Sequence, residues 1–132
     1  MFKHNITYTD FNGDERSEDF YFHLSLPEVT RIEVKAGKSL SEHTKAIVES
    51  GDANKLIEFL EEVILSSYGI KTSDGRSFQK SAEIRRDFEY SQAYAELFEQ
   101  FMIDPDLPRK FGEGVADNGK NKKNQIAPNV VQ

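Results

Sequence analysis

The chain has 132 residues, enough for one domain with its own core, and 37% of them are hydrophobic. Its net charge of −6, from 17 Lys and Arg against 23 Asp and Glu, argues against general nucleic-acid binding and against docking on an anionic membrane. The absence of cysteine excludes disulfides, thiolate catalysis and cysteine-ligated metals. No segment resembles a signal peptide or a membrane span, so we expect the protein to act in the cytosol of the cell that makes it.

A β-hairpin is predicted over residues 3–25. The first arm alternates polar residues with Ile6 and Tyr8, which is typical of a half-buried strand. The second arm places three apolar side chains on one face: Phe20, Phe22 and Leu24. Between the arms, Asn12-Gly13 supplies the positive φ angles that a tight hairpin turn requires. Because an isolated hairpin is unstable in water, we expect its Phe face to lie against helices.

The corner of this hairpin is acidic, with Asp14, Glu15, Glu18 and Asp19 close together in the sequence. Such a cluster fits either a solvated turn or a cation site. We favour the solvated turn over the cation site.

Two capping boxes predict helix starts at Ser25-Leu26-Pro27-Glu28 and at Ser39-Leu40-Ser41-Glu42. The first opens a short helix over residues 29–36, although Thr30, Ile32 and Val34 would also fit a strand. The second opens a helix that ends at Gly51. Asp52 then caps a further helix at once, so these last two helices should run antiparallel or nearly so.

Residues 52–68 hold the densest apolar run of the chain and predict its central helix. Leu56, Leu60, Val63 and Ile64 recur at helical spacing, while Phe59 and other apolar residues widen the stripe. A helix this apolar must be covered on more than one side.

The rest of the chain predicts a small hairpin or ordered loop and then more helices. Asp74-Gly75 is a turn signal within residues 70–81. Helical periodicity follows from Ser81, with a break near Glu89-Tyr90-Ser91, where Ser91 can cap a separate helix that reaches Ile103. After Asp104-Pro105 we expect a short turn over residues 107–111, closed before Gly112 and Gly114.

These elements define an α+β fold, with an N-terminal β-hairpin packed on a bundle of about four to five helices. Residues 1–116 form a single predicted domain. Residues 117–132 are rich in Asn and Lys and poor in apolar side chains, so we expect an extended tail that is disordered or ordered by a partner.

No group of residues in the sequence carries recognisable catalysis. The histidines, His4, His23 and His43, lie on different elements and lack metal-ligand spacing. Glu61 and Glu62 diverge by about 100° on their helix and cannot share a site. The pair Asp104 and Asp106 is explained by capping at a helix end. We therefore expect no enzyme activity, no metal and no cofactor.

Binding to other proteins remains as a function. Several helices carry more apolar and aromatic residues than one small core needs: Ile57, Phe59, Tyr90, Tyr94, Phe98 and Phe101. Either all of them are core, or some form a helix-binding groove or a self-association patch. We select Tyr90, Tyr94, Phe98 and Phe101 as candidate protein-binding residues.

Four segments resemble a known family: ITYTDFNG at Ile6–Gly13, EDFYF at Glu18–Phe22, YGIKTSDGRSFQKS at Tyr68–Ser81 and QAYAELF at Gln92–Phe98. The chain is similar from Ile6 to about Ile103 to small proteins of tailed-phage and prophage structural gene clusters, the tail assembly chaperones. The polar tail departs from the pattern of this family.

The resemblance implies a non-enzymatic, mostly helical protein of the host cytoplasm. It would bind the tape-measure protein and keep it soluble until tail-tube subunits polymerise around it, and a longer frameshifted product is common in the family. The alternative is a virion structural protein, such as a head-decoration, connector or tail component held by the hairpin and the tail. A more remote alternative is an acidic inhibitor of a host enzyme.

Overall fold

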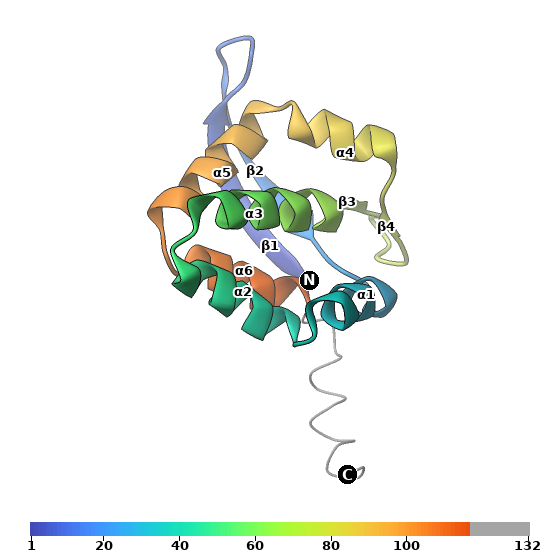
Figure 1. The fold of residues 1–132 in the computed structure, drawn as a ribbon. Coiled ribbons are helices and arrows are strands. Elements are labelled where there is room, and N and C mark those ends of the chain that lie inside the picture. Colours follow the sequence, from blue (N-terminus) through green and yellow to red (C-terminus); the bar gives the residue numbers. More distant parts are fainter. Residues whose placement is uncertain (117–132) are drawn as a thin grey trace.

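The computed structural model describes residues 1–116 of the chain. Figure 1 shows the elements in chain order. The strands are β1 (Phe2–Thr9), β2 (Glu15–Phe22), β3 (Tyr68–Lys71) and β4 (Phe78–Gln79). The helices are α1 (Leu26–Ala36), α2 (Leu40–Ser50), α3 (Ala53–Ser67), α4 (Ala82–Glu89), α5 (Gln92–Ile103) and α6 (Leu107–Val115). The α+β class is confirmed, with six helices in the described part of the chain where four to five were expected. The predicted tail, residues 117–132, lies outside the described residues.

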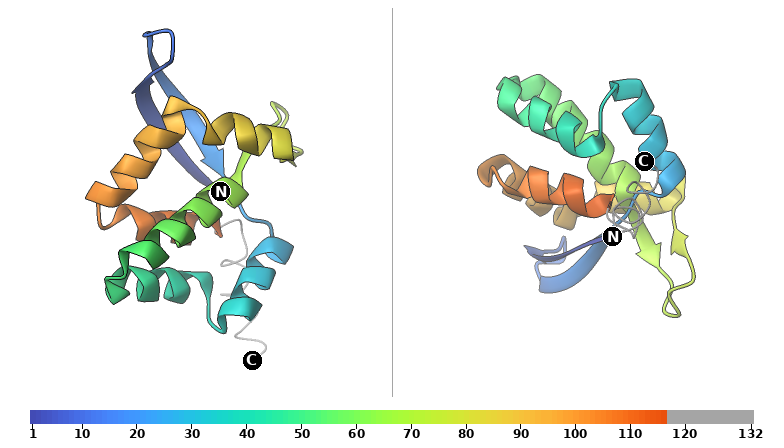
Figure 2. Two further views of the ribbon diagram at one scale, coloured as in Figure 1. Left: turned by 45° about the horizontal axis from the view of Figure 1, so that its top comes forward. Right: turned by 90° about the horizontal axis from the view of Figure 1, so that it is seen from below.

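The N-terminal hairpin forms as predicted, with β1 and β2 antiparallel from Phe2 opposite Phe22 to Thr9 opposite Glu15. Its tip projects beyond the helices, which lie to one side of the hairpin (Figures 1 and 2). The turn differs from the tight Asn-Gly turn that we expected. A turn of that type needs a positive φ at both residues, whereas here only Gly13 has one, of 89°. The Asp10 carboxylate instead closes a longer loop by accepting hydrogen bonds from the backbone N–H groups of residues 12 and 14.

The small hairpin of β3 and β4 extends the first one into a four-stranded sheet of order β1-β2-β3-β4. The new junction pairs Phe22 with Tyr68 and Tyr21 with Gly69. A side chain at residue 69 would not fit here, because a Cβ atom would lie 2.8 Å from the carbonyl oxygen of Gln79. The sequence predicted a small hairpin or an ordered loop here, and it did not predict the pairing with β2.

Side-chain caps set the helix starts. Both predicted capping boxes are present, at Ser25 before α1 and at Ser39 before α2, so the segment after Ser25 is a helix and not a strand. Asp52 caps α3 by accepting from the N–H groups of residues 54 and 55. Ser91 accepts from the N–H of Tyr94 and starts α5 separately from α4, as the predicted break indicated.

The core lies where α3 and the Phe face of the hairpin meet the C-terminal helices. Helix α3 is buried on a broad stripe that includes Leu60, Val63, Ile64 and Leu65. Phe22 lies at the centre of an aromatic cluster, with ring centroids 5.4 Å from Phe111 and 5.8 Å from Phe88. The expected covering of the Phe face by helices is therefore confirmed.

Helix α6 corrects the prediction for the end of the domain. We expected a turn over residues 107–111 closed before two glycines, whereas the helix continues through Gly112 and Gly114 to Val115. Both glycines serve close packing. A Cβ atom on Gly112 would lie 2.8 Å from Thr44 Oγ1, and one on Gly114 would lie 2.7 Å from Cδ1 of Phe2. At the end of α6, the carbonyl oxygen of Val115 accepts a hydrogen bond from the backbone N–H of Leu24, which links α6 to the segment after β2.

Candidate partner-binding groove

The four residues selected from the sequence do not form one exposed surface. Tyr90, just after α4, is 70% exposed, whereas Phe101 is 2% exposed and packs against Phe111. Tyr94 and Phe98 are half-buried, with ring centroids 6.1 Å apart, and Tyr94 also packs edge-on against Phe88. A role of these four residues in binding a partner stays a prediction.

The three histidines lie in separate places. His4 Nε2 is 2.8 Å from Gln100 Oε1, His23 packs edge-on against the ring of Phe78, and His43 lies on α2. Within residues 1–116, no group of three or more His, Asp or Glu side chains could hold a metal ion. At the acidic hairpin corner, Arg16 forms ion pairs with Asp10 and with Glu18.

A groove of about 1040 Å³ lies elsewhere, between α1, α2 and α3. Its apolar lining comes from all three helices and from the link before α1: Leu24, Ile32, Ala36, Ala46, Ile47, Phe59 and Val63. Leu24 and Val63 are buried at its base, whereas Ile32, Ile47 and Phe59 keep part of their surface open. The groove thus offers apolar surface to a partner without any rearrangement of the core.

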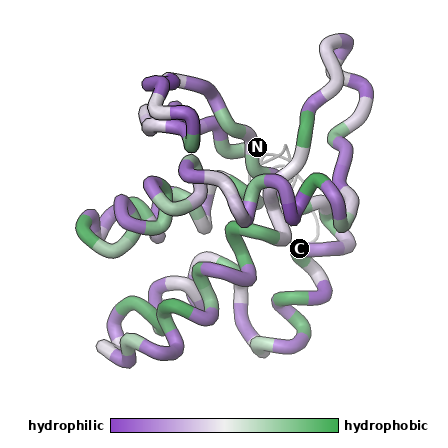
Figure 3. Tube along the Cα trace, turned by 90° about the horizontal axis from the view of Figure 1, so that it is seen from above, coloured by the Kyte–Doolittle hydropathy of each residue, from purple (hydrophilic) through white to green (hydrophobic). Residues whose placement is uncertain are grey.

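Helical spacing explains why these side chains converge. On α3, Phe59 and Val63 lie one turn apart on a face whose edge carries Lys55, Glu58 and Glu62. On α1, Ile32 and Ala36 are also one turn apart. Figure 3 shows hydrophobic and hydrophilic residues alternating along the helices, as this spacing requires.

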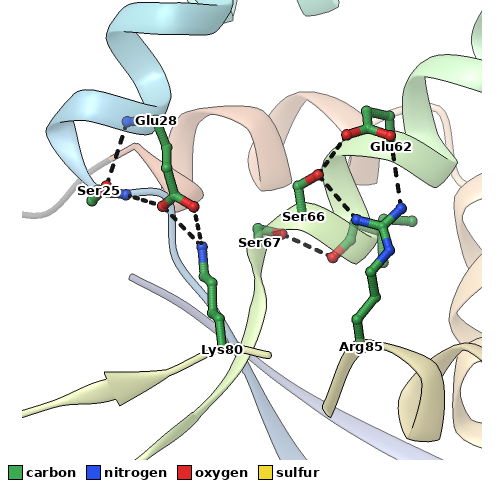
Figure 4. Close-up of polar contacts among 8 residues, drawn as sticks. Ser25, Glu28, Glu62, Ser66, Ser67, Lys80 and Arg85 are labelled. Carbon is green, nitrogen blue, oxygen red and sulfur yellow. Dashed lines mark hydrogen bonds and ion pairs between the residues drawn. The ribbon is translucent and has the colours of Figure 1, made fainter. Parts of the chain in front are cut away.

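Two polar networks fix the helices near one end of the groove (Figure 4). Glu28 of α1 accepts from the backbone N–H of Ser25 and forms an ion pair with Lys80 Nζ at 2.9 Å. On α3, Glu62 accepts a hydrogen bond from Ser66 and lies 3.7 Å from a guanidinium nitrogen of Arg85. The first set of contacts links α1 to the segment after β4, and the second links α3 to α4. The two walls of the groove are therefore held in place by different parts of the protein.

The base of the groove stays uncharged at neutral pH. His43 of α2 lines it and packs edge-on against Phe59, with ring centroids 5.1 Å apart. Burial, helped by the nearby charge of Lys38, lowers the pKa of His43 below its usual value. The imidazole is therefore neutral at pH 7 and adds to the apolar surface.

Sequence reasoning found one residue of this groove. Phe59 was among the apolar side chains that exceeded the needs of one core, and it lines the groove. The contributions of Ile32 and Ile47 were missed, because amphipathic helices bury such residues by default. The available signal was the weak pattern of residues 29–36, where Val34, now 76% exposed, follows Ile32 too closely for one buried face.

The described part of the chain therefore has an α+β fold with an open apolar groove walled by three helices. None of the helices in this part is long and apolar enough to cross a membrane. The chain belongs to the phage tail assembly chaperone family, whose model matches residues 1–124. This confirms the resemblance found in the sequence. No curated protein and no solved structure gives a significant match.

Proposed function

We propose that the protein is a non-enzymatic chaperone that binds helical segments of the tape-measure protein in the cytoplasm of the host until the tail tube assembles. The groove between α1, α2 and α3 is the observation that carries this proposal. Its position between helical walls and its apolar base suit the apolar face of an amphipathic helix, one of the recurring modes of peptide recognition.

Membership of the family supports tail proteins as the partners, and the net charge of −6 supports a role in holding apolar segments in solution. The partially open side chains of Ile32, Ile47 and Phe59 would be covered by a bound helix and exposed again when it leaves. Transient binding of this kind needs no catalytic residue.

A second contact surface is proposed around α4 and α5. Tyr90 is well exposed there, and Tyr94 and Phe98 of α5 are half-buried. This surface would contribute to the tape-measure or tail-tube contact, or to self-association. It lies on different helices from the groove, so the two surfaces can be tested by separate variants.

The groove is tested by co-expression of the tape-measure protein of the same phage with a variant that fills it. Ala46 is exposed and lines the groove, so Ala46→Trp adds bulk without removing any buried packing. The matched control is Ser41→Trp, on the same helix but outside the groove. We expect Ala46→Trp to abolish co-purification and Ser41→Trp to retain it. Equal co-purification of both variants would place the binding site elsewhere.

The alternative role, as a structural component of the virion, is separated by location. Mass spectrometry of purified particles and of the producing cells should find the protein abundant in the cells and absent from the particles, because a chaperone leaves before the particle is complete. Stoichiometric amounts in particles would favour the structural role.

A further inference from the structure

We infer that the groove selects helices whose apolar stripe is flanked by acidic residues on the side that faces α1, and that this charge pattern fixes the direction in which the helix lies. The inference rests on the proposed function, which names the groove but leaves the chemistry of the bound segment open. It follows from the distribution of charge along the two walls.

The α1 side of the groove is basic in an otherwise acidic protein. Arg31 and Lys35 of α1 and Lys38 in the link to α2 line the groove and are exposed. Their side chains have no ion-pair or hydrogen-bond partner among residues 1–116. Two other cations near the groove, Lys80 and Arg85, are paired with carboxylates of the protein. The three cations of the α1 side are therefore free to pair with a ligand.

The α3 side has no comparable run of unpaired cations. Glu58 and Glu62 are exposed on this wall, one helical turn apart. Lys55, one turn nearer the start of α3, is the exception and lies at the end of the wall. Glu62 is paired with Arg85, so Glu58 is the carboxylate of this wall without an ion-pair partner among residues 1–116. A helix whose acidic flank faced α3 would meet Glu58 and gain little, whereas the reverse placement pairs that flank with the three cations of the α1 side.

Charges at an open rim mainly set orientation, association rate and partner choice, while apolar burial supplies most of the affinity. The apolar base accepts any amphipathic helix of suitable width. The basic α1 side adds the discrimination, because it attracts an acidic flank of the ligand and repels a basic one. The binding segment should therefore be acidic on one flank.

The test uses an array of overlapping peptides that together cover the tape-measure protein of the same phage. Binding of the full-length chain to each peptide is measured. Peptides of about 25 residues, about seven helical turns, are long enough to fill the groove. The variant Arg31→Glu/Lys38→Glu reverses two cations of the α1 side. Its matched control, Lys45→Glu/Lys110→Glu, makes the same change of charge at two exposed helical positions outside the groove. Equal unfolding midpoints of both variants would show that the fold is retained.

We expect the bound peptides to share an acidic flank beside an apolar stripe. Arg31→Glu/Lys38→Glu should weaken the binding of these peptides at least about tenfold at low salt, and the control variant should change it little. Replacing the acidic residues of a peptide with Lys should restore its binding to Arg31→Glu/Lys38→Glu. This inference would be overturned if the peptides bound wild type and Arg31→Glu/Lys38→Glu equally. The proposed function would still stand if Ala46→Trp abolished the binding of the same peptides. If no peptide binds, or if Ala46→Trp blocks none, the proposed use of the groove fails as well.

Discussion

Gly112 of α6 approaches Thr44 of α2 so closely that a Cβ atom on the glycine would lie 2.8 Å from Oγ1 of the threonine. Thr44 cannot easily move away, because its side chain is 2% exposed and its hydroxyl donates a hydrogen bond to the carbonyl oxygen of Leu40. The contact holds α6 against α2, and α2 forms part of the groove. The packing of the C-terminal helix thus helps to position the proposed binding site.

The first prediction concerns this contact. In an open helix, Gly→Ala raises stability by up to about 1 kcal/mol. Here we expect Gly112→Ala to lower the free energy of unfolding by about 1–3 kcal/mol, as overpacking does in a well-packed core. The free energy of unfolding is measured by urea unfolding followed by circular dichroism. The double variant Gly112→Ala/Thr44→Ala relieves the clash, so its loss should be smaller than the sum of the two single losses. A Gly112→Ala protein as stable as wild type would show that α2 and α6 separate without cost.

The same two residues show where sequence reasoning failed. Glycines at residues 112 and 114 are a normal helix stop, so the sequence predicted that the last turn ends before them. Whether a glycine ends a helix or admits a neighbour depends on Thr44 and Phe2, which are distant in sequence. Helix caps, which have a local cause, were predicted correctly, as at Ser25 and Ser91, where the side chain caps the backbone a few residues on.

Long-range pairing set the other limit. The turn at residues 74–75 predicted a small hairpin or an ordered loop, but nothing in its sequence indicates that Gly69 pairs with Tyr21 of the first hairpin. The groove has the same origin, because it depends on how α1, α2 and α3 are placed relative to one another. Composition alone indicated that Phe59 exceeds the needs of one core. Ile47 also lines the groove, but only because of how the three helices are placed.

The second prediction concerns acid stability. Burial raises the pKa of Glu28, but the hydrogen bonds from Ser25 and the ion pair with Lys80 outweigh burial and hold that pKa below its usual value. A lowered pKa means that the ionised carboxylate stabilises the folded state above the unfolded pKa of about 4.3, and that this contribution is lost as pH falls through the folded pKa. The stability advantage of wild type over Glu28→Gln should thus be full at pH 6 and shrink below about pH 4.

Urea unfolding at several pH values measures this difference. Gln keeps an oxygen that can accept from the backbone N–H of Ser25, so the change mainly removes the charge. Glu99→Gln, on the exposed side of α5, is the control and should follow the wild-type curve at all pH values. If the gap between wild type and Glu28→Gln did not change with pH, the ion pair to Lys80 would contribute nothing to folding.

The third prediction separates core from surface among the residues selected for binding. Phe101→Ala should lower the free energy of unfolding by about 3–5 kcal/mol, because it empties a fully buried site against Phe111. Tyr90→Ala should change it by no more than about 0.5 kcal/mol, since Tyr90 is 70% exposed. If the second surface binds a partner, Tyr90→Ala will weaken co-purification of the tape-measure protein at unchanged stability. Unchanged binding would remove Tyr90 from the proposed contact.

The last prediction concerns the hydroxyl of Tyr94, which is buried and has no hydrogen-bond partner among residues 1–116. Burial, together with the charges of Glu61 and Glu89, raises the pKa of Tyr94 to about 12, so the group stays protonated at neutral pH. A buried hydroxyl without a partner costs about 1–3 kcal/mol, and its removal costs nothing in packing. We therefore expect Tyr94→Phe to leave the free energy of unfolding unchanged or to raise it by about 1 kcal/mol in urea unfolding.

Tyr8→Phe is the matched control for this change. The Tyr8 hydroxyl donates to Glu18 Oε1 at 2.7 Å, so the same loss of one oxygen should lower stability by about 1 kcal/mol at pH 7. Equal destabilisation by the two variants would mean that the Tyr94 hydroxyl has a bonded partner in solution. If Tyr94→Phe is stabilising yet weakens binding of the tape-measure protein, the unsatisfied hydroxyl is retained for the partner, because a hydrogen bond formed only in the complex gives a reason to tolerate its cost in the free protein.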